Sequence, residues 1–431
     1  MNALLTDLYE LTMAAGYFAA GKQAEVATFE FTIRRLPRNR EFVVTAGLHR
    51  ACEYLLNFRF EPGDILYLRG LPSFQNVPAA FWEYLADFRF TGDVMAVPEG
   101  TILYAGQPVM NIRAPLIEAQ LPETYLLSAI TFETLIATKA ALITHEARGR
   151  DVIEFGTRRA HTPEAGVLAA RAAYIGGCAG TSNVLAGQRY GVPVMGTAAH
   201  SWVMSFASEE EAFRRLQSLL GDRTVHLIDT YDPMEGARIA ARVGNPLWGV
   251  RIDSGDFLEI SRLVRRILDD AGLKDAKIMA SGDLDEHRIK TIVSAGAPID
   301  AFGVGTELAT SGDAPSMGTV YKLVEIHRDG AVRYAVKNAE DKGTIPGAKQ
   351  LFRLMDHDVL ALAHENVEGA EPLLQPVIRG GKLVGPLPSL AETRARAQSA
   401  LAIWPAGTRR TLRSRALSKL DEEVRAVHAA V

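Results

Sequence analysis

The sequence predicts an α/β protein made of an irregular (β/α) barrel of about seven parallel strands and a discontinuous α+β domain of sandwich-like character. Between residues 151 and 308, seven short apolar runs alternate with helix-like stretches, which is typical of βα units whose strands are buried on both faces. The flanking segments alternate apolar and polar residues, which is typical of half-buried strands. A chain of 431 residues is also too long for one average domain.

In each of the seven units of the predicted barrel, the apolar run stops at a Gly, Thr, Ser or Asp. In order they are DVIEFGTRR, YIGGCAGTSN, GVPVMGTAAH, TVHLIDTYD, LWGVRIDSGD, KIMASGDLD and IDAFGVGTEL. Seven successive units favour a closed or nearly closed barrel over an open sheet. Because catalytic groups gather at the carboxyl-terminal ends of barrel strands, we expect the functional residues there.

The predicted domain boundaries follow the change in pattern along the chain. The divisions are an N-terminal α+β domain at residues 1–120, completed by about residues 319–380, an α/β-barrel domain at 121–318, and a helical, Arg-rich tail at 381–431. Within them, residues 1–20 have the apolar spacing of an amphipathic helix. Residues 122–148 predict a long, mostly apolar helix.

Composition excludes several classes of protein. The net charge of −4, from 47 basic and 51 acidic side chains, gives no global field suited to nucleic acid, and we interpret the basic residues 408–419 as a solvated helix face. Apolar runs are interrupted before the length of about 18 residues that a membrane span needs, and the N-terminus does not resemble a signal peptide. Cys52 and Cys178 are too few for a disulfide framework and suit a reducing cytoplasm. We therefore expect a cytoplasmic protein without nucleic-acid or membrane partners.

Familiar phosphate-binding and hydrolase motifs are missing. The chain has no GxxxxGK[ST] loop, strand-borne GxGxxG, HExxH or GxSxG. Any phosphate must therefore be held by short turns at strand ends. Gly303, Gly305 and Thr306 precede a helix and could form such a cradle, although a plain βα turn explains them equally well.

Carboxylates and cations follow other strand ends. Asp253 and Asp283 come at the ends of successive strands, where paired carboxylates suit Mg²⁺ or sugar hydroxyls. Taken singly, an aspartate such as Asp256 or Asp285 is better explained as a helix N-cap. Arg251 lies close to Asp253 and Asp256 in the run RIDSGD.

Two further loops carry imidazoles or guanidinium groups. Arg158, Arg159 and His161 share one loop, where an arginine could bind a carboxylate or phosphate, or form a surface salt bridge. His200 follows Gly196, Thr197 and two alanines, residues too small to cover it. A lone histidine is more often a core residue, but its place at a strand end favours function. No strand end carries the lysine an aldolase would use, since Lys277 lies at a strand start.

Ten motifs resemble those of the nicotinate phosphoribosyltransferase family, in the order expected. They are LLTDLYELTMAAGYF, TFEFTIRRLP, EFGTRRA, GTSNVLAG, GTAAHSW, VRIDSGD, SGDLDE, FGVGTEL, YKLVE and PGAKQLFR, spanning residues 4 to about 353. The resemblance implies a reaction of nicotinate with phosphoribosyl pyrophosphate that yields nicotinate mononucleotide and pyrophosphate for NAD synthesis. It also implies ATP hydrolysis through a phosphorylated histidine, Mg²⁺ as cofactor and a homodimer with shared active sites.

The resemblance assigns roles to particular residues. His200 matches the phosphorylated histidine, and Arg251 and Thr197 match nicotinate-binding positions. The other positions it implies are Tyr9 from the partner subunit and Phe155 beside the pyridine ring, Arg158 at the pyrophosphate or the carboxylate, Asp253 and Asp283 near the ribose and metal, Gly303, Gly305 and Thr306 at the 5′-phosphate, and Ser201 and Gly282 among the remaining substrate contacts.

Three details refine the resemblance. Ser182 stands where the related nicotinamide enzyme has an aspartate, which would repel nicotinate. His161 replaces the expected glutamine in the RRA loop, and two cysteines cannot form the zinc site of some relatives. Nicotinamide phosphoribosyltransferase and a non-catalytic phosphoribosyl-pyrophosphate-binding protein remain alternatives. Quinolinate phosphoribosyltransferase is disfavoured because it would need more cations and no phosphohistidine, and a generic barrel lyase has no candidate base with a clear partner.

Overall fold

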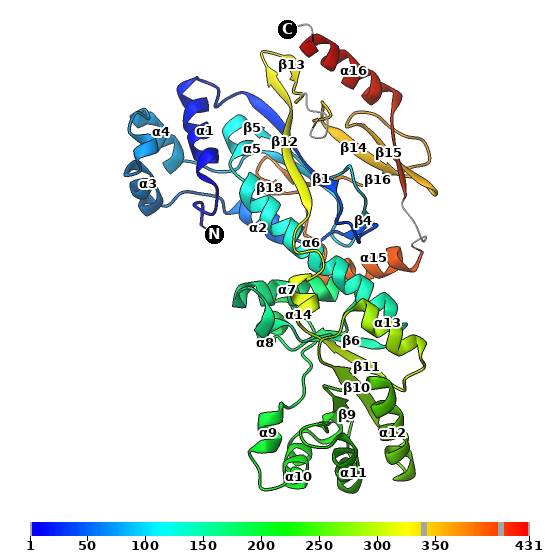
Figure 1. The fold of residues 1–431 in the computed structure, drawn as a ribbon. Coiled ribbons are helices and arrows are strands. Elements are labelled where there is room, and N and C mark those ends of the chain that lie inside the picture. The colour runs from blue at the N-terminus through cyan, green and yellow to red at the C-terminus, as the bar shows by residue number, and fades with distance from the viewer. Residues whose placement is uncertain (1, 338–342, 404–408, 430–431) are drawn as a thin grey trace. The chain divides into compact units, whose positions relative to one another are not determined.

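The chain divides into two compact units in the computed structural model, which describes residues 2–337, 343–403 and 409–429. The antiparallel unit comprises residues 1–135 and 316–431, and the parallel unit comprises residues 136–315 (Figure 1). The division falls inside the long helix α6 (Glu123–Glu146), whereas the sequence pattern placed a boundary just before it, at residue 120.

A seven-stranded sheet forms the centre of the antiparallel unit, with the strand order β13-β12-β1-β5-β3-β17-β18. Its strands are β1 (Val26–Arg35), β3 (Asp93–Ala96), β5 (Gln107–Pro115), β12 (Gly318–Arg328), β13 (Ala331–Tyr334), β17 (Gln375–Arg379) and β18 (Lys382–Leu383). Strand β1 lies between β12 and β5 and is antiparallel to both. The chain therefore returns to the N-terminal sheet after residue 318.

A second, four-stranded sheet of this unit has the order β16-β14-β15-β19. Its strands are β14 (Lys349–Arg353), β15 (His357–Leu362), β16 (Glu371–Pro372) and β19 (Arg410–Arg413), and a separate pair consists of β2 (Val43–Val44) and β4 (Ile102–Leu103). The buried Lys349 Nζ contacts Glu30 Oε2 at 3.2 Å, and the Asn111 amide donates to the Lys349 carbonyl at 2.6 Å. Strand β1 is therefore covered on both faces, although its alternating sequence predicted a half-buried strand.

Helices complete the antiparallel unit. They are α1 (Leu8–Ala19), α2 (Leu48–Leu56), α3 (Pro62–Arg69), the short 3-10 helix η1 (Pro72–Phe74), α4 (Ala79–Ala86), α5 (Leu116–Gln120), α15 (Leu390–Ala402) and α16 (Arg415–Ala429). Tyr54 stacks on Tyr125 with ring centroids 3.8 Å apart, and Phe29 stacks on Tyr321 at 5.1 Å. The tail at 381–431, predicted as helical, contains α15 and α16 but also contributes β18 and β19 to the two sheets.

The parallel unit contains a six-stranded sheet of order β7-β6-β11-β10-β9-β8. Its strands are β6 (Asp151–Glu154), β7 (Gly180–Thr181), β8 (Val225–Leu227), β9 (Gly249–Ile252), β10 (Lys277–Ser281) and β11 (Ala301–Val304). Val194 adds a single parallel bridge to Thr181, so six strands and one bridge correspond to the seven predicted runs. The third run is short because Pro193 lacks an N–H and glycines flank it.

The strand order is that of a barrel opened at one seam. Each strand pairs with the next one around, from Val194 through β7, β6, β11, β10 and β9 to β8. Within the described residues, no pairing joins Val194 to β8, which leaves the irregular barrel open there. The helices of the unit are η2 (Thr157–Arg159), α7 (Pro163–Ile175), α8 (Val184–Tyr190), α9 (His200–Met204), α10 (Glu209–Leu220), η3 (Gly221–Arg223), α11 (Pro233–Val243), α12 (Phe257–Asp270), α13 (Glu286–Ser294) and α14 (Thr306–Thr310).

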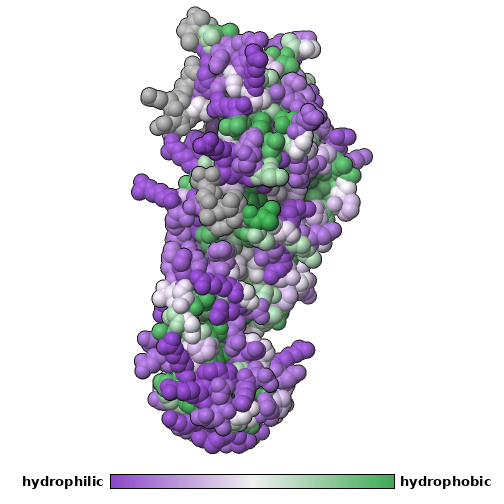
Figure 2. All heavy atoms as spheres, turned by 90° about the vertical axis from the view of Figure 1, so that its right-hand side faces the viewer, coloured by the Kyte–Doolittle hydropathy of each residue, from purple (hydrophilic) through white to green (hydrophobic). Residues whose placement is uncertain are grey.

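One helical stretch, Leu116–Glu146, is long and apolar enough to cross a membrane by length and composition alone. Within the structure, 72% of its most apolar window is buried, as in the core helices of water-soluble folds that pass the same test. On the face shown in Figure 2, hydrophilic residues dominate and hydrophobic residues form separate patches. The apolar character of this stretch is therefore accounted for by packing inside the fold.

Candidate active site

The carboxyl-terminal ends of β9, β10, β11 and β6 bring several predicted site residues to one edge of the parallel sheet. Ser281 of β10 is in register with Gly303 of β11, and Asp253 follows directly after β9. The Phe155 N–H donates to the Val304 carbonyl at 2.8 Å, which joins the end of β6 to the same edge. Parallel pairing therefore assembles residues that are about 150 positions apart in the sequence, as such strand ends do in barrels.

His200 begins helix α9, and its side chain is 39% exposed. Its Nδ1 lies 3.2 Å from Thr230 Oγ1, and its Nε2 lies 3.7 Å from Asp253 Oδ2. Both ring nitrogens thus face oxygen atoms that orient the imidazole, while the small residues before it leave the ring open to solvent. An exposed and oriented imidazole is suited to accept a transferred group.

Arg251 links two of the strand-end segments. Its Nη1 donates to Thr197 Oγ1 and, at 3.3 Å, to the Ala198 carbonyl. Its Nη2 lies 3.2 Å from Asp253 Oδ1, and its side chain is only 13% exposed. The guanidinium is therefore held against the loop that precedes His200.

Asp253 stands at the centre of these contacts. It accepts a hydrogen bond from Ser281 Oγ in addition to its contacts with Arg251 and His200. Burial alone would raise the pKa of Asp253, but the Ser281 hydrogen bond and the adjacent Arg251 lower it overall below its ordinary value. The carboxylate is therefore ionised at neutral pH and presents a fixed negative charge beside His200.

Glycines at this edge let neighbouring segments approach more closely than a side chain would allow. A Cβ at Gly282, whose φ is +100°, would lie 2.0 Å from the Asp253 carbonyl oxygen. A Cβ at Gly303 would lie 2.6 Å from the Phe155 ring, and one at Gly305 would lie 3.3 Å from the Phe155 carbonyl oxygen. Close backbone approach thus requires glycine at position 282 and favours it at 303.

Other predicted residues lie less centrally. Asp283 follows β10 with a φ of +46° and is exposed, while its carbonyl accepts from Arg288 at 3.0 Å. Asp256 and Asp285 cap helices α12 and α13, the alternative that the sequence favoured for single aspartates. Thr306, at the start of α14, has an exposed side chain.

The remaining predicted residues lie outside the contacts that join His200, Arg251 and Asp253. Arg158 in η2, His161 after it and Ser201 in α9 have exposed side chains. Phe155 is partly buried and packs against a small cluster that contains Met279. Tyr9 lies on α1 of the antiparallel unit and is 46% exposed.

The sequence reasoning missed residues that support the cluster. Asp229 Oδ2 accepts from the Asp253 N–H at 2.9 Å and from Ser254 Oγ at 2.8 Å, and Thr230 faces His200. The fully buried Glu154 accepts from the Gly156 N–H and, at 2.5 Å, from Thr181 Oγ1. The signal for Asp229 and Thr230 was the run IDTYD, which ends a strand in the same way as RIDSGD.

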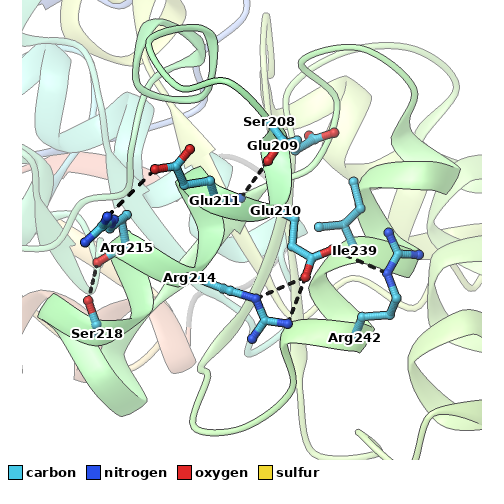
Figure 3. Close-up of a pocket in the computed structure, with 9 residues that line it drawn as sticks. All are labelled: Ser208, Glu209, Glu210, Glu211, Arg214, Arg215, Ser218, Ile239 and Arg242. Carbon is cyan, nitrogen blue, oxygen red and sulfur yellow. Dashed lines mark hydrogen bonds and ion pairs between the residues drawn. The ribbon is translucent and has the colours of Figure 1, made fainter.

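A pocket of about 730 Å³ in the parallel unit lies elsewhere, between α10 and α11 (Figure 3). It contains none of the predicted site residues. Figure 3 shows Glu210 between two arginines, with Arg214 Nη2 at 2.8 Å and Arg242 Nε at 3.7 Å. Arg215 Nη2 likewise lies 3.8 Å from Glu211 Oε1, so two of the pocket's carboxylates are paired with arginines.

A nearly closed parallel barrel with a cation, a carboxylate, an exposed imidazole and close-packed glycines at its strand ends defines an α/β enzyme with its active site at that edge. Comparisons with known proteins identify the group. Residues 4–131 match the nicotinate phosphoribosyltransferase (NAPRTase) N-terminal domain, and residues 151–344 match the nicotinate phosphoribosyltransferase (NAPRTase) family. The chain belongs to the nicotinate phosphoribosyltransferase family.

Individual relatives agree with this assignment. The chain is 43% identical over 395 residues to nicotinate phosphoribosyltransferase pncB2 of Mycobacterium tuberculosis, covering 89% of this chain and 83% of that protein. It is 42% identical over 387 residues to the Bacillus subtilis nicotinate phosphoribosyltransferase, covering 86% and 78%. The crystal structure of human nicotinic acid phosphoribosyltransferase is similar with a TM-score of 0.83 and 29% identity, covering 97% of this chain and 99% of that one.

Proposed function

We propose that this protein is a nicotinate phosphoribosyltransferase that forms nicotinate mononucleotide and pyrophosphate from nicotinate and phosphoribosyl pyrophosphate, with coupled ATP hydrolysis, for NAD synthesis. The observation that carries the proposal is the double contact of Asp253 with His200, at 3.7 Å, and with Arg251, at 3.2 Å. One carboxylate thus connects the proposed phosphoryl acceptor to the proposed nicotinate cation. The names of the relatives at 42–43% identity agree with this activity.

In this proposal, Arg251 and Thr197 bind the nicotinate carboxylate. Because an arginine presents a fork of N–H donors, it recognises a carboxylate with directional hydrogen bonds. Phe155 flanks the pyridine ring, and Tyr9 of the partner subunit covers it. Ser182, exposed after β7, puts no negative charge there, which favours the acid over nicotinamide as substrate. We place Arg158 and Ser201 among the remaining substrate contacts.

His200 is proposed to accept the γ-phosphoryl group of ATP. We assign Nε2 as the attacking nitrogen, because Nδ1 lies within hydrogen-bond distance of Thr230 Oγ1 at 3.2 Å whereas the contact of Nε2 with Asp253 is longer, at 3.7 Å. Nε2 forms the N–P bond while the bond between the γ-phosphorus and the oxygen that leaves with ADP breaks. Phosphohistidine then carries about two negative charges next to Asp253. Such a charge changes the affinity of the site for pyrophosphate and its metal, so ATP can drive a step in which it takes no covalent part.

The sugar chemistry needs a site that stabilises charge. The ribose carbon passes through a transition state of oxocarbenium character as pyrophosphate leaves, and the ionised Asp253 stabilises the positive sugar. Gly282, Gly303, Gly305 and Thr306 are proposed to hold the phosphates with backbone N–H groups and a hydroxyl.

Mg²⁺ is proposed as the metal. The described residues contain no cluster of three or more His, Cys, Asp or Glu side chains able to hold an ion, so binding would depend on pyrophosphate oxygens together with Asp253 and Asp283. Two carboxylates plus substrate oxygens fit Mg²⁺, which keeps several waters. When bound, it would neutralise the charge that develops on pyrophosphate.

We further propose a cytoplasmic homodimer with shared active sites. Apolar side chains exposed by the parallel unit support a subunit contact, namely Val184 at 72%, Leu185 at 45% and Val194 at 53%. Cys52 and Cys178 are both buried and form no disulfide, which suits a reducing compartment.

The proposed activity is tested by incubating the purified protein with phosphoribosyl pyrophosphate, Mg²⁺, ATP and either nicotinate or nicotinamide, followed by mass measurement of the product. We expect nicotinate mononucleotide, with ADP formed in step. Formation of only the nicotinamide product would favour the nicotinamide enzyme. Binding of phosphoribosyl pyrophosphate without turnover of either pyridine would favour a non-catalytic protein.

The shared site is tested by mixing two inactive variants, Tyr9→Ala and His200→Ala, which lie on different units of the chain. If Tyr9 acts in the partner's site, a mixed dimer contains one intact site, and we expect up to about a quarter of wild-type activity after subunit exchange. Each variant alone is the control. No recovery in mixtures that demonstrably contain mixed dimers would assign each site to a single chain.

A further inference from the structure

The first turns of α1 and α6 meet in the antiparallel unit and bring acidic side chains together. Thr124 Oγ1 donates to Asp7 Oδ2 at 2.8 Å. The side-chain amide of Gln120, Nε2, donates to Glu10 Oε2 at 2.7 Å and to Glu123 Oε2 at 3.1 Å. Two carboxyl groups thus share one amide.

Glu10 is fully buried, and its second oxygen, Oε1, has no hydrogen-bond partner among the described residues. A buried anionic oxygen without a donor is strongly unfavourable, whereas a protonated carboxyl is not. The charged and titratable groups around the pair come from α1, its N-cap, α2 and β12. They are Asp7, Tyr9, Tyr17, Tyr54, Tyr321 and Lys322. The single cation in this set, Lys322, cannot balance three carboxylates.

The two carboxyl groups differ in how well they tolerate charge. Burial, assisted by Glu123, raises the pKa of Glu10 to about 7. Burial also raises the pKa of Glu123, but Lys322 opposes this, and Glu123 opens helix α6, where the helix dipole favours an anion. Below about pH 7 the proton therefore lies on Glu10 and the charge on Glu123.

We propose that Glu10 and Glu123 share a single proton and form a positioning pair that fixes the first turn of α1, and with it the neighbouring side chain of Tyr9. The role of Tyr9 beside the pyridine rests on the proposed function, whereas the shared proton does not. When the proton is lost, one Gln120 amide faces two negative charges, and Glu10 must move toward water. Tyr9, the preceding residue of the same helical turn, moves with it.

The direction of the pH effect follows from the raised pKa of Glu10. Because the folded state holds this proton more tightly than an unfolded glutamate, the arrangement is stable at low pH and weakens as the pH rises through about 7. Glu10→Gln keeps the shape and stays neutral, so it should hold the turn in place at every pH. Glu118→Gln is a matched control, because Glu118 is also buried but accepts from Thr91 instead.

The pair is tested first by nuclear magnetic resonance of ¹³C-labelled tyrosine in the full chain, with the Tyr9 signal assigned by Tyr9→Phe. We expect this signal to shift with a midpoint near pH 7 in the wild type and in Glu118→Gln, and to stay constant in Glu10→Gln. A wild-type signal that does not shift between about pH 6 and pH 8, or one that shifts equally in Glu10→Gln, would overturn the proposal.

The positioning role is then measured kinetically. From the midpoint near pH 7 to one pH unit above it, the protonated fraction of Glu10 falls about fivefold, so the nicotinate KM of the wild type should rise by up to about fivefold from pH 7 to pH 8. Glu10→Gln should remove this rise and leave kcat within about twofold. If the nicotinate KM rises equally in the wild type and in Glu10→Gln, the pair does not position Tyr9, even if the Tyr9 resonance shifts with pH. Absence of turnover in the wild type would instead count against the proposed function, and the resonance would still decide whether the proton is shared.

Discussion

Two histidines of the parallel unit stand in opposite environments. His200 begins α9 with 39% of its side chain exposed and both ring nitrogens facing oxygen atoms. His226 lies within β8, is fully buried, and has neither ring nitrogen hydrogen-bonded among the described residues. Its ring stacks on Phe213 at a centroid distance of 4.3 Å. An imidazole is thus a candidate reactive group at position 200 and a buried ring that only packs against Phe213 at position 226.

The difference shows what makes an imidazole usable. Burial without partners lowers the pKa of His226 to about 4, so it stays neutral and inaccessible. His200 instead combines a solvent-exposed ring with the Thr230 and Asp253 contacts that orient it. Orientation and access, rather than burial, are therefore the features that point to function, and each of the following predictions changes one side of this contrast.

The largest effect is expected from His200→Ala. If His200 accepts the phosphoryl group, the variant should form no acid-labile phosphoprotein and should lose ATP coupling entirely, because no other exposed imidazole is held beside Asp253 in the described structure. Phosphoprotein is measured with ATP labelled in the γ position. Unfolding midpoints check that the fold is intact, and His226→Phe, which should still be phosphorylated, is the matched control. Phosphorylation of His200→Ala would rule out the assignment.

Arg251→Ala should have the next largest effect. Loss of a charge-assisted contact to the carboxylate typically costs several kcal/mol, so we expect the KM for nicotinate to rise about 100-fold. The KM for nicotinamide, which has no carboxylate, should change far less. Arg251→Lys is the control that keeps the charge but loses the fork of donors. An equal effect on both pyridines would argue for a structural role through Thr197 and Asp253.

Much of the fold could be predicted because local patterns agreed with the final packing. Apolar runs that end in small or acidic residues predicted the strands β6 and β8 to β11, and the apolar stretch at 122–148 predicted α6. The return of the chain to β1 after residue 318 was also predicted and is confirmed by the pairing with β12. These features depend on periodicity and length, which one sequence contains.

What could not be predicted depends on contacts distant in the sequence. The burial of Glu30 requires Lys349, and the shared amide of Glu10 and Glu123 requires Gln120 from another helix. His226 differs from His200 in sequence only by lying within a strand rather than after one. The convergence of His200, Arg251 and Asp253 was foreseen from strand-end position and is observed, while their chemical roles stay predictions.

His226→Phe tests the buried side of the contrast. Removing two unpartnered polar nitrogens while keeping the stacked ring should stabilise the fold by about 1 kcal/mol at pH 8. Because the folded-state pKa of His226 is below that of an unfolded histidine, the wild type loses stability as the pH falls from about 6.5 toward 4. The advantage of the variant should therefore grow by about 2 kcal/mol at pH 5.

This effect is measured by urea unfolding at the two pH values. His161→Phe, at an exposed position, is the control and should show no such growth. A constant difference between His226→Phe and the wild type would mean that His226 is protonated in the folded state, which would contradict the burial argument.

The smallest effect is expected from Ser281→Ala, which removes one hydrogen bond to Asp253 and leaves the contacts of that carboxylate with His200 and Arg251. A hydrogen bond to a charged group contributes about 1.5–3 kcal/mol, but the remaining partners compensate part of it, so we expect kcat/KM to fall about 3- to 10-fold. The pKa of Asp253 should rise, because the Ser281 hydrogen bond is one of the interactions that lower it. The acidic limb of the pH–rate profile should therefore move toward neutral pH. Ser281→Thr, which keeps the hydroxyl, should leave that limb in place, and an unshifted limb in Ser281→Ala would show that Asp253 does not control the rate from its position between His200 and Arg251.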